Sequence, residues 1–231
     1  MNYDIEGRYF TAQAGLQDRI SFIRSVYLWL MGGFAVAGLA ALAAYVTTPL
    51  WVAAFRSMGQ LFGWLIFGAQ MGAILFAQAV SRRRPLNILA FALFTGVSGY
   101  VAGMISTIYA TTIGPGVVLA AAGMTAGDFL VLTVVSFVSK KDFSFLRNFV
   151  IIGVSVMFFG GLIAAIFRLE AFSLVIAAVA VVACSAKILY DTSLMLRTRD
   201  FSDPAGFALN LFVSLYNIFI SLLRLLGGRR D

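Results

Sequence analysis

The segment Pro85–Gly127, PLNILAFALFTGVSGYVAGMISTIYATTIGPGVVLAAAGMTAG, decides the fold class because it contains 43 consecutive residues without a charge. A helix needs about 20 apolar residues to cross the hydrocarbon core of a bilayer, so this run is too long for one span. The turn-forming residues of TTIGPG, Thr111–Gly116, lie beyond its middle. The segment therefore predicts two transmembrane helices joined by a short turn, with Asp128 inside the second helix.

The rest of the chain has the same apolar character. Hydrophobic residues make up 61% of its 231 residues and charged residues only 12%, and the mean hydropathy is +0.95. Soluble domains are about half apolar and about a quarter charged. We therefore expect an all-α membrane protein with room for about six or seven spans. Residues 1–25 are predicted to form a cytoplasmic amino-terminal segment, residues 26–226 a single transmembrane domain, and residues 227–231 a short tail.

Several classes of function are excluded by residues that the chain lacks. It has no histidine and one cysteine, Cys184, so an intrachain disulfide and a histidine-assisted nucleophile are both impossible. Asp128 and Asp191 lack the surrounding motifs of intramembrane aspartyl proteases, and we predict no enzymatic activity, no cofactor and no metal site. The net charge of +7 comes from basic residues at the ends of apolar runs. Membrane orientation explains such residues, so we expect no nucleic-acid partner.

The remaining spans are predicted at residues 26–46, 61–80, 148–167, 171–195 and 207–226. Basic residues in short loops resist translocation. Alternate loops hold eleven of them: Arg8, Arg19, Arg24, Arg82, Arg83, Arg84, Lys140, Lys141, Arg147, Arg197 and Arg199. The other loops hold only Arg56 and Arg168, so the bias predicts a cytoplasmic amino terminus.

The last apolar segment conflicts with this orientation. A complete crossing by residues 207–226 would place Arg229 and Arg230 outside the cell. Two alternatives remain open: a true seventh span, or a re-entrant hairpin that is lined by protein and leaves the tail in the cytoplasm.

Small residues predict close contacts between helices. Gly99 and Gly103 form a GxxxG pair, and Gly153, Gly160 and Gly161 share one span. Such residues allow helix backbones to approach each other in membranes.

Charges inside the spans need partners. Lys187 and Asp191 are four residues apart, which places both on one helix face together with Cys184. The pair is either a neutralised contact inside the bundle or part of an ion path, since ionisable groups within membranes are candidates for function. Asp128 has no basic residue in its own span. Its partner must be another helix, water or a proton, and its role either a hydrogen-bond donor or an ion site.

A polar stripe runs along the last segment with a helical spacing of three and four residues. Its members are Asn210, Ser214, Asn217, Ser221 and Arg224. Because lipid would penalise this stripe, we expect it to face an aqueous cavity near Asp191. The alternative is that the stripe supplies hydrogen bonds between helices.

Four segments resemble the Bax inhibitor family of multi-pass membrane proteins. The most specific are ILYDTS at residues 188–193 and LNLFVSLYNIFISLLRLLG at residues 209–227. SRRRPLNILAFALFTGVSG at residues 81–99 and KKDFSFL at residues 140–146 resemble the family at the same places. The resemblance implies six outer helices around a central carboxy-terminal helix, in a bacterial inner membrane.

The resemblance also implies two functions. Some bacterial relatives form a pH-sensitive calcium leak, and others restrain a membrane-bound quality-control protease. The family's proposed pH sensor is a pair of aspartates that share a proton and are latched to an arginine. Asp191 matches the first aspartate and one of Arg82, Arg83 and Arg84 matches the latch, but Ser214 replaces the second aspartate.

Lys187 is a further departure from the family pattern, and we expect its charge to keep Asp191 ionised. We therefore predict a cation leak, with calcium as a permeant ion, whose pH gating is altered or weakened. The alternative is a regulator of a membrane protease. The predicted ion path or gate comprises Asp191, Lys187, Ser214, Asn217, Asn210 and Asp128.

Overall fold

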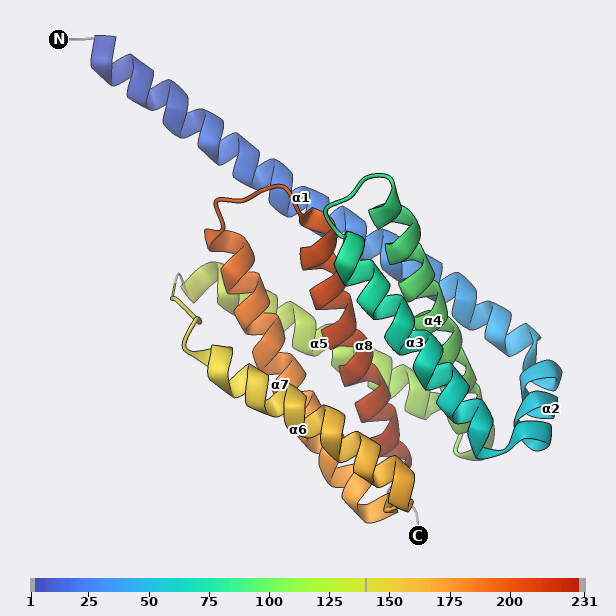
Figure 1. Cartoon of the computed structure of the whole chain (residues 1–231). Coiled ribbons are helices and arrows are strands. Elements are labelled where there is room, and N and C mark those ends of the chain that lie inside the picture. Colours follow the sequence, from blue (N-terminus) through green and yellow to red (C-terminus); the bar gives the residue numbers. More distant parts are fainter. Residues whose placement is uncertain (1–2, 140, 229–231) are drawn as a thin grey trace.

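The computed structural model describes residues 3–139 and 141–228, which form helices and short connections without a strand. The helices in Figure 1 are α1 (Tyr3–Val46), α2 (Thr48–Met58), α3 (Gln60–Val80), α4 (Leu86–Thr112), α5 (Pro115–Ser139), α6 (Leu146–Phe167), α7 (Glu170–Arg197) and α8 (Pro204–Gly227). Seven of these, all except α2, are long and apolar enough to cross a membrane. The predicted all-α membrane fold is confirmed.

The turn predicted at Thr111–Gly116 separates α4 from α5. α4 ends at Thr112 and α5 begins at Pro115. Gly114 has a φ of 125°, a backbone conformation that residues with a side chain rarely adopt. Proline suits the first turn of a helix because its missing N–H would have no partner there.

In the amino-terminal part of the fold, α1 runs without a break through residue 25, and Phe22 and Val26 pack in the core. The division into a cytoplasmic segment and a transmembrane domain at this residue stays a prediction. α2 lies in a stretch expected to be a loop, and its 11 residues are too few to cross a bilayer. Trp51 fixes α2 against the end of α1, because its indole N–H donates to the carbonyl of Ala44 at 2.9 Å.

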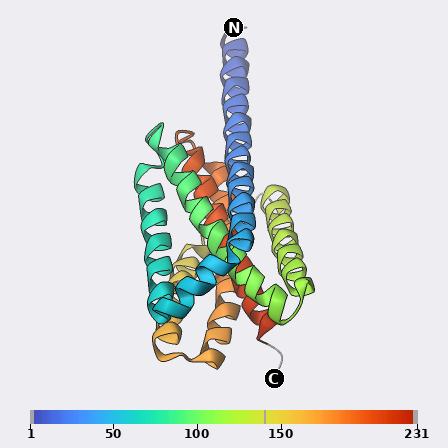
Figure 2. The ribbon, with the colours of Figure 1, turned by 90° about the vertical axis from the view of Figure 1, so that its right-hand side faces the viewer.

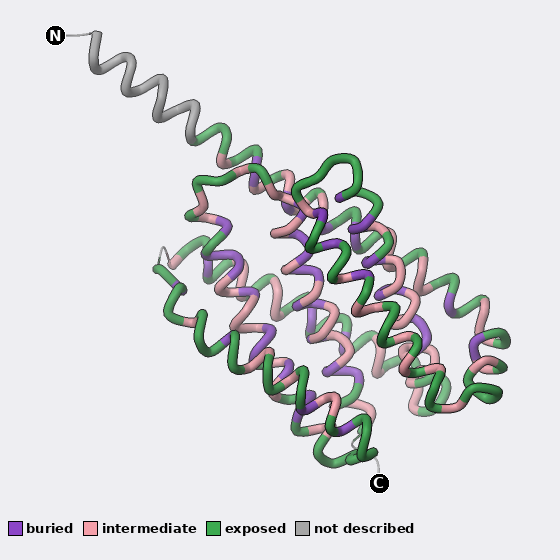
Figure 3. The backbone as a smooth tube through the Cα atoms, in the orientation of Figure 1, coloured by how far each residue is buried: buried purple, intermediate pink, exposed green. Residues whose placement is uncertain are grey.

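α8 has the largest buried share of the candidate spans, with 56% of its most apolar window inside the molecule. It packs against α7, α1, α5 and α4. In Figure 3, buried stretches, drawn in purple, recur along α8. α6 packs chiefly against α7 instead. The arrangement of six outer helices around the last one therefore does not follow from these contacts and stays a prediction.

α8 is also continuous from one end of the bundle to the other. It begins beside Ser81, which follows α3, and Gly227 near its end lies against Tyr109 in the last turn of α4. The re-entrant hairpin is therefore wrong for the residues described. Arg229 and Arg230, together with the rest of the tail at residues 229–231, lie outside the described residues, as does Lys140.

The predicted GxxxG contact joins α1 and α4. A Cβ added at Gly99 would lie 2.3 Å from the carbonyl oxygen of Ala37, and one at Gly103 would lie 2.6 Å from the Cα of Ala41. Both neighbours are backbone atoms, so the two helices touch directly where the glycines lie.

The predicted contacts of the α6 glycines are only partly correct. Gly153 and Gly160 lie against side chains of α7. Gly161 does not contact α7, and an added Cβ there would meet no atom within 4 Å. The expectation of a helix contact at Gly161 is therefore wrong.

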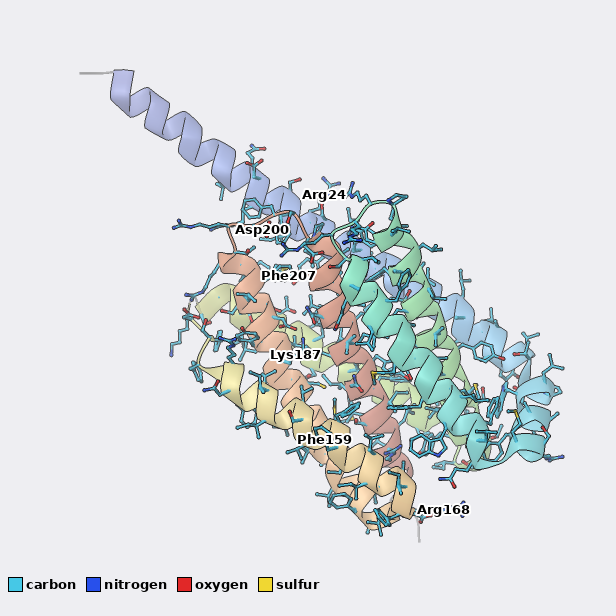
Figure 4. The ribbon with its side chains drawn as sticks, in the orientation of Figure 1. Arg24, Phe159, Arg168, Lys187, Asp200 and Phe207 are labelled. Atoms are coloured by element: carbon cyan, nitrogen blue, oxygen red, sulfur yellow. The ribbon has the colours of Figure 1, made fainter. Side chains whose placement is uncertain are left out.

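Labelled residues distinguish the two ends of the bundle. Arg24 and Asp200 lie at one end, called here the Asp200 end, and Arg168 lies at the other, called the Arg168 end (Figure 4). Figure 2 shows that α1 projects beyond the bundle at the Asp200 end, with α3 and α5 on opposite sides of it. The cytoplasmic placement of the Asp200 end stays a prediction.

Candidate functional site

Lys187 and Asp191 form an ion pair between successive turns of α7. The Nζ of Lys187 contacts Oδ2 of Asp191 and lies 3.3 Å from Oδ1 of Asn210 on α8. Only 19% of the lysine side chain and 9% of the aspartate side chain are exposed. The ammonium group therefore joins the carboxylate of α7 to the polar stripe of α8.

A small cavity of about 260 Å³ lies beside this ion pair, toward the Asp200 end. Asp191 and Asn210 line it together with Gln78 and Ser81 from the end of α3 and Asp203 from the start of α8. Asp191 is therefore reachable from the cavity although only 7% of the residue is exposed.

A large cavity of about 640 Å³ lies toward the Arg168 end. α3 and α4 line it from one side and α6 and α7 from the other, while α8 contributes Asn217, Ser221 and Arg224 of the polar stripe. The amide of Asn217 donates to the carbonyl of Val213 at 2.8 Å. Most of the stripe thus faces one of these two cavities.

Lys187 and Ser214 lie between the two cavities and line neither of them. On α7, Ala180 lines the large cavity and Asp191 the small one, and Cys184 and Lys187 occupy the turns between them on the same face. Ser214 has no exposed surface, and its hydroxyl donates to the carbonyl of Asn210 at 3.0 Å. Packed side chains therefore separate the cavities.

The predicted arginine latch engages different carboxylates from the one expected. Arg82 lies 3.7 Å from Asp203 and 3.4 Å from Asp200, both in the connection to α8, rather than on Asp191. Arg83 and Arg84 are exposed. The pKa of Asp200 lies below its ordinary value, chiefly because Ser202 donates hydrogen bonds to this carboxylate and also because Arg82 lies nearby. Asp200 is therefore ionised at neutral pH.

Asp203 lines the small cavity and was not among the residues predicted for the site. Its Oδ1 accepts a hydrogen bond from the backbone N–H of Gly206 at 2.8 Å, which caps α8, and its Oδ2 accepts one from Ser81 at 3.1 Å. The dipeptide Asp203-Pro204 indicates the helix cap, since an aspartate before a proline is typical of a helix start. No pattern in the sequence indicates the hydrogen bond between Asp203 and Ser81, which follows α3.

Asp203→Ala is expected to lower the free energy of unfolding by about 1–2 kcal/mol, because the variant loses a helix cap and leaves Ser81 without its acceptor. Thermal unfolding in detergent measures the change. Asp200→Ala is the control: its side chain is 56% exposed, so its ion pair with Arg82 contributes little. An equal change in both variants would show that the cap is unimportant.

Asp128 lies apart from the ion pair. Its Oδ2 accepts a hydrogen bond from Ser185 of α7 at 2.8 Å, so its partner comes from another helix. It lines neither the small nor the large cavity. No described contact joins it to Ser214, so its use as a replacement for the missing second aspartate has no support in this geometry.

Comparison with known proteins agrees with this layout. Residues 19–231 match the family model described as Inhibitor of apoptosis-promoting Bax1. The chain belongs to the Bax inhibitor family. This match begins within α1 and covers the last six candidate spans completely and the first from residue 19 onward.

Three relatives illustrate the breadth of the family. The Modulator of FtsH protease YccA of Escherichia coli strain K12 is 32% identical over 157 residues, which cover 68% of this chain and 71% of the relative. An uncharacterized membrane protein of Vibrio cholerae is 31% identical over 160 residues, covering 69% and 71%. The Golgi anti-apoptotic protein of vaccinia virus is 27% identical over 223 residues, covering 93% and 88%.

Proposed function

We propose that this protein modulates a membrane-bound protease from within a bacterial inner membrane and is not itself an enzyme. The family membership and the relative named as a modulator of FtsH protease support this proposal. The observation that carries it is the ion pair of Lys187 and Asp191. This pair occupies the carboxylate that the competing proposal, an ion path, would use.

An ion path through Asp191 needs this carboxylate to exchange one bound cation for the next. Here the ammonium of Lys187 is attached to the same helix as Asp191 and also reaches Asn210. A tethered group has a high effective concentration at its partner, so a free cation competes poorly for the carboxylate. The pair therefore supports a structural role for Asp191, and the protein acts through its surface.

The surface available to a protease includes α1, which projects beyond the bundle at the Asp200 end (Figure 2). A cytoplasmic amino terminus would place this projection where the soluble part of a membrane protease can reach it.

Degradation of a membrane-protein substrate by a purified FtsH-type protease tests the proposal. In proteoliposomes, the full chain is expected to slow degradation, and a chain without residues 1–20 is expected to lose both this effect and co-purification with the protease. Unchanged degradation in the presence of the full chain would refute the proposal.

A cation leak, with calcium as the permeant ion, is the second candidate. The small and large cavities near opposite ends of the polar stripe favour it. In that case Asp191→Asn would remove the flux of the wild-type protein, and Ser214→Asp would restore proton sensitivity by supplying the second carboxylate.

A further inference from the structure

The large cavity between the membrane-spanning helices has the size of a ligand-binding site. Its volume of about 640 Å³ lies in the range of about 300–1,000 Å³ that is usual for small-ligand sites. α3 packs on α4 and α6 packs on α7. Figure 1 shows these two pairs on opposite sides of α8, and residues from both pairs line the cavity. Across it, the rings of Phe67 and Phe158 approach to 6.4 Å between centroids. A transmembrane helix, about 10–12 Å in diameter, is too thick for this space.

The walls of the cavity are mainly apolar and leave unfilled space. Trp64, Met71 and Leu162 line it in addition to the two phenylalanines. Gly63 on α3 and Gly161 on α6 line opposite walls, and an added Cβ at either residue would meet no atom within 4 Å. A flexible hydrocarbon chain matches this lining.

The Arg168 end of the cavity is basic. Arg224 lines the cavity, and none of the described carboxylates pairs with it. Arg168 donates from Nη2 to Oε1 of Gln60, a neutral group that also lines the cavity, at 2.9 Å. Glu170 is exposed at the same end and forms no described ion pair with either arginine. Guanidinium groups bind phosphate through paired hydrogen bonds.

We propose that the large cavity binds an anionic phospholipid of the surrounding bilayer, with one acyl chain between α3 and α6 and the phosphate group on Arg224 and Arg168. Both parts of the ligand are needed: the apolar walls take the chain, and the two guanidinium groups select the negative headgroup. Basic pockets between transmembrane helices bind lipid headgroups in this way. The site is independent of Asp191 and of the proposed action on a protease.

Native mass spectrometry of the delipidated full chain tests this site. Phosphatidylglycerol and phosphatidylcholine with identical acyl chains are added separately, so that only the headgroup charge differs. Phosphatidylglycerol is expected to bind about tenfold or more tightly, as befits a charge-assisted contact. Arg224→Gln should remove this preference, whereas Arg84→Gln, which changes an exposed arginine near the opposite end, should keep it. Equal binding of the two lipids would overturn the proposal.

Variants that fill the cavity distinguish lipid bound at this site from lipid bound around the outside of the protein. Gly161→Leu and Gly63→Leu each place a side chain in the unfilled space from opposite walls, and each is expected to reduce phosphatidylglycerol binding. Gly72→Leu is the matched control, because Gly72 is exposed on α3, has equal free space and does not line the cavity. Tight binding that survives both cavity-filling changes in folded protein would place the lipid elsewhere and overturn the proposal.

Discussion

Lys187→Met is expected to lower the free energy of unfolding by about 3–5 kcal/mol, because it leaves the carboxylate of Asp191 buried without its counter-ion. The side chain of Asp191 is 9% exposed, so water cannot replace the ammonium group fully. The corresponding fall in melting temperature is on the order of 10 °C for a chain of this length. Thermal unfolding in detergent, with the lipid composition held constant, measures it.

The double variant Lys187→Met/Asp191→Leu is the control for this prediction. Replacing both members of a buried ion pair with apolar residues is often nearly neutral, so the double variant should recover most of the lost stability. If Lys187→Met alone unfolds like the wild type, the ion pair does not hold α7 and α8 in place.

Gly99→Ala is expected to lower the free energy of unfolding by about 3 kcal/mol or more, at the upper end of the cost of overfilling a packed interface. The added methyl group would lie 2.3 Å from the carbonyl oxygen of Ala37 and 2.4 Å from its Cα. These are backbone atoms of α1 and cannot rotate away, so α1 and α4 must separate.

Gly96→Ala offers a matched comparison three residues earlier on α4. A methyl group there would meet a side-chain atom of Val36 at 3.7 Å, an ordinary contact. Since alanine favours helix over glycine, Gly96→Ala should be neutral or slightly stabilising. Similar unfolding of the two variants in detergent would show that the close approach of α1 and α4 is not limiting.

The features that the sequence predicts correctly are those that depend on local geometry. The uncharged run at Pro85–Gly127 gives two spans because bilayer thickness and turn residues suffice to divide it. The pairing of Lys187 with Asp191 follows from helix periodicity alone, and the GxxxG contact at Gly99 follows from residue size. None of these needs knowledge of a distant segment.

The features that the sequence does not predict depend on how helices are rotated and where loops meet. Asp128 finds Ser185, and Arg82 finds Asp203, through contacts between segments more than 50 residues apart. Gly161 faces a cavity although its neighbour Gly160 faces α7, a difference of about 100° around one helix. α2 is too short to give the hydropathy signal of a span.

Calcium entry into dye-loaded liposomes tests most directly whether Asp191 has a structural role or belongs to an ion path. Wild-type protein, Asp191→Asn and Lys187→Met are all predicted to match protein-free liposomes, because packed side chains separate the two cavities. A wild-type flux that disappears in Asp191→Asn and is unchanged in Lys187→Met would contradict the account.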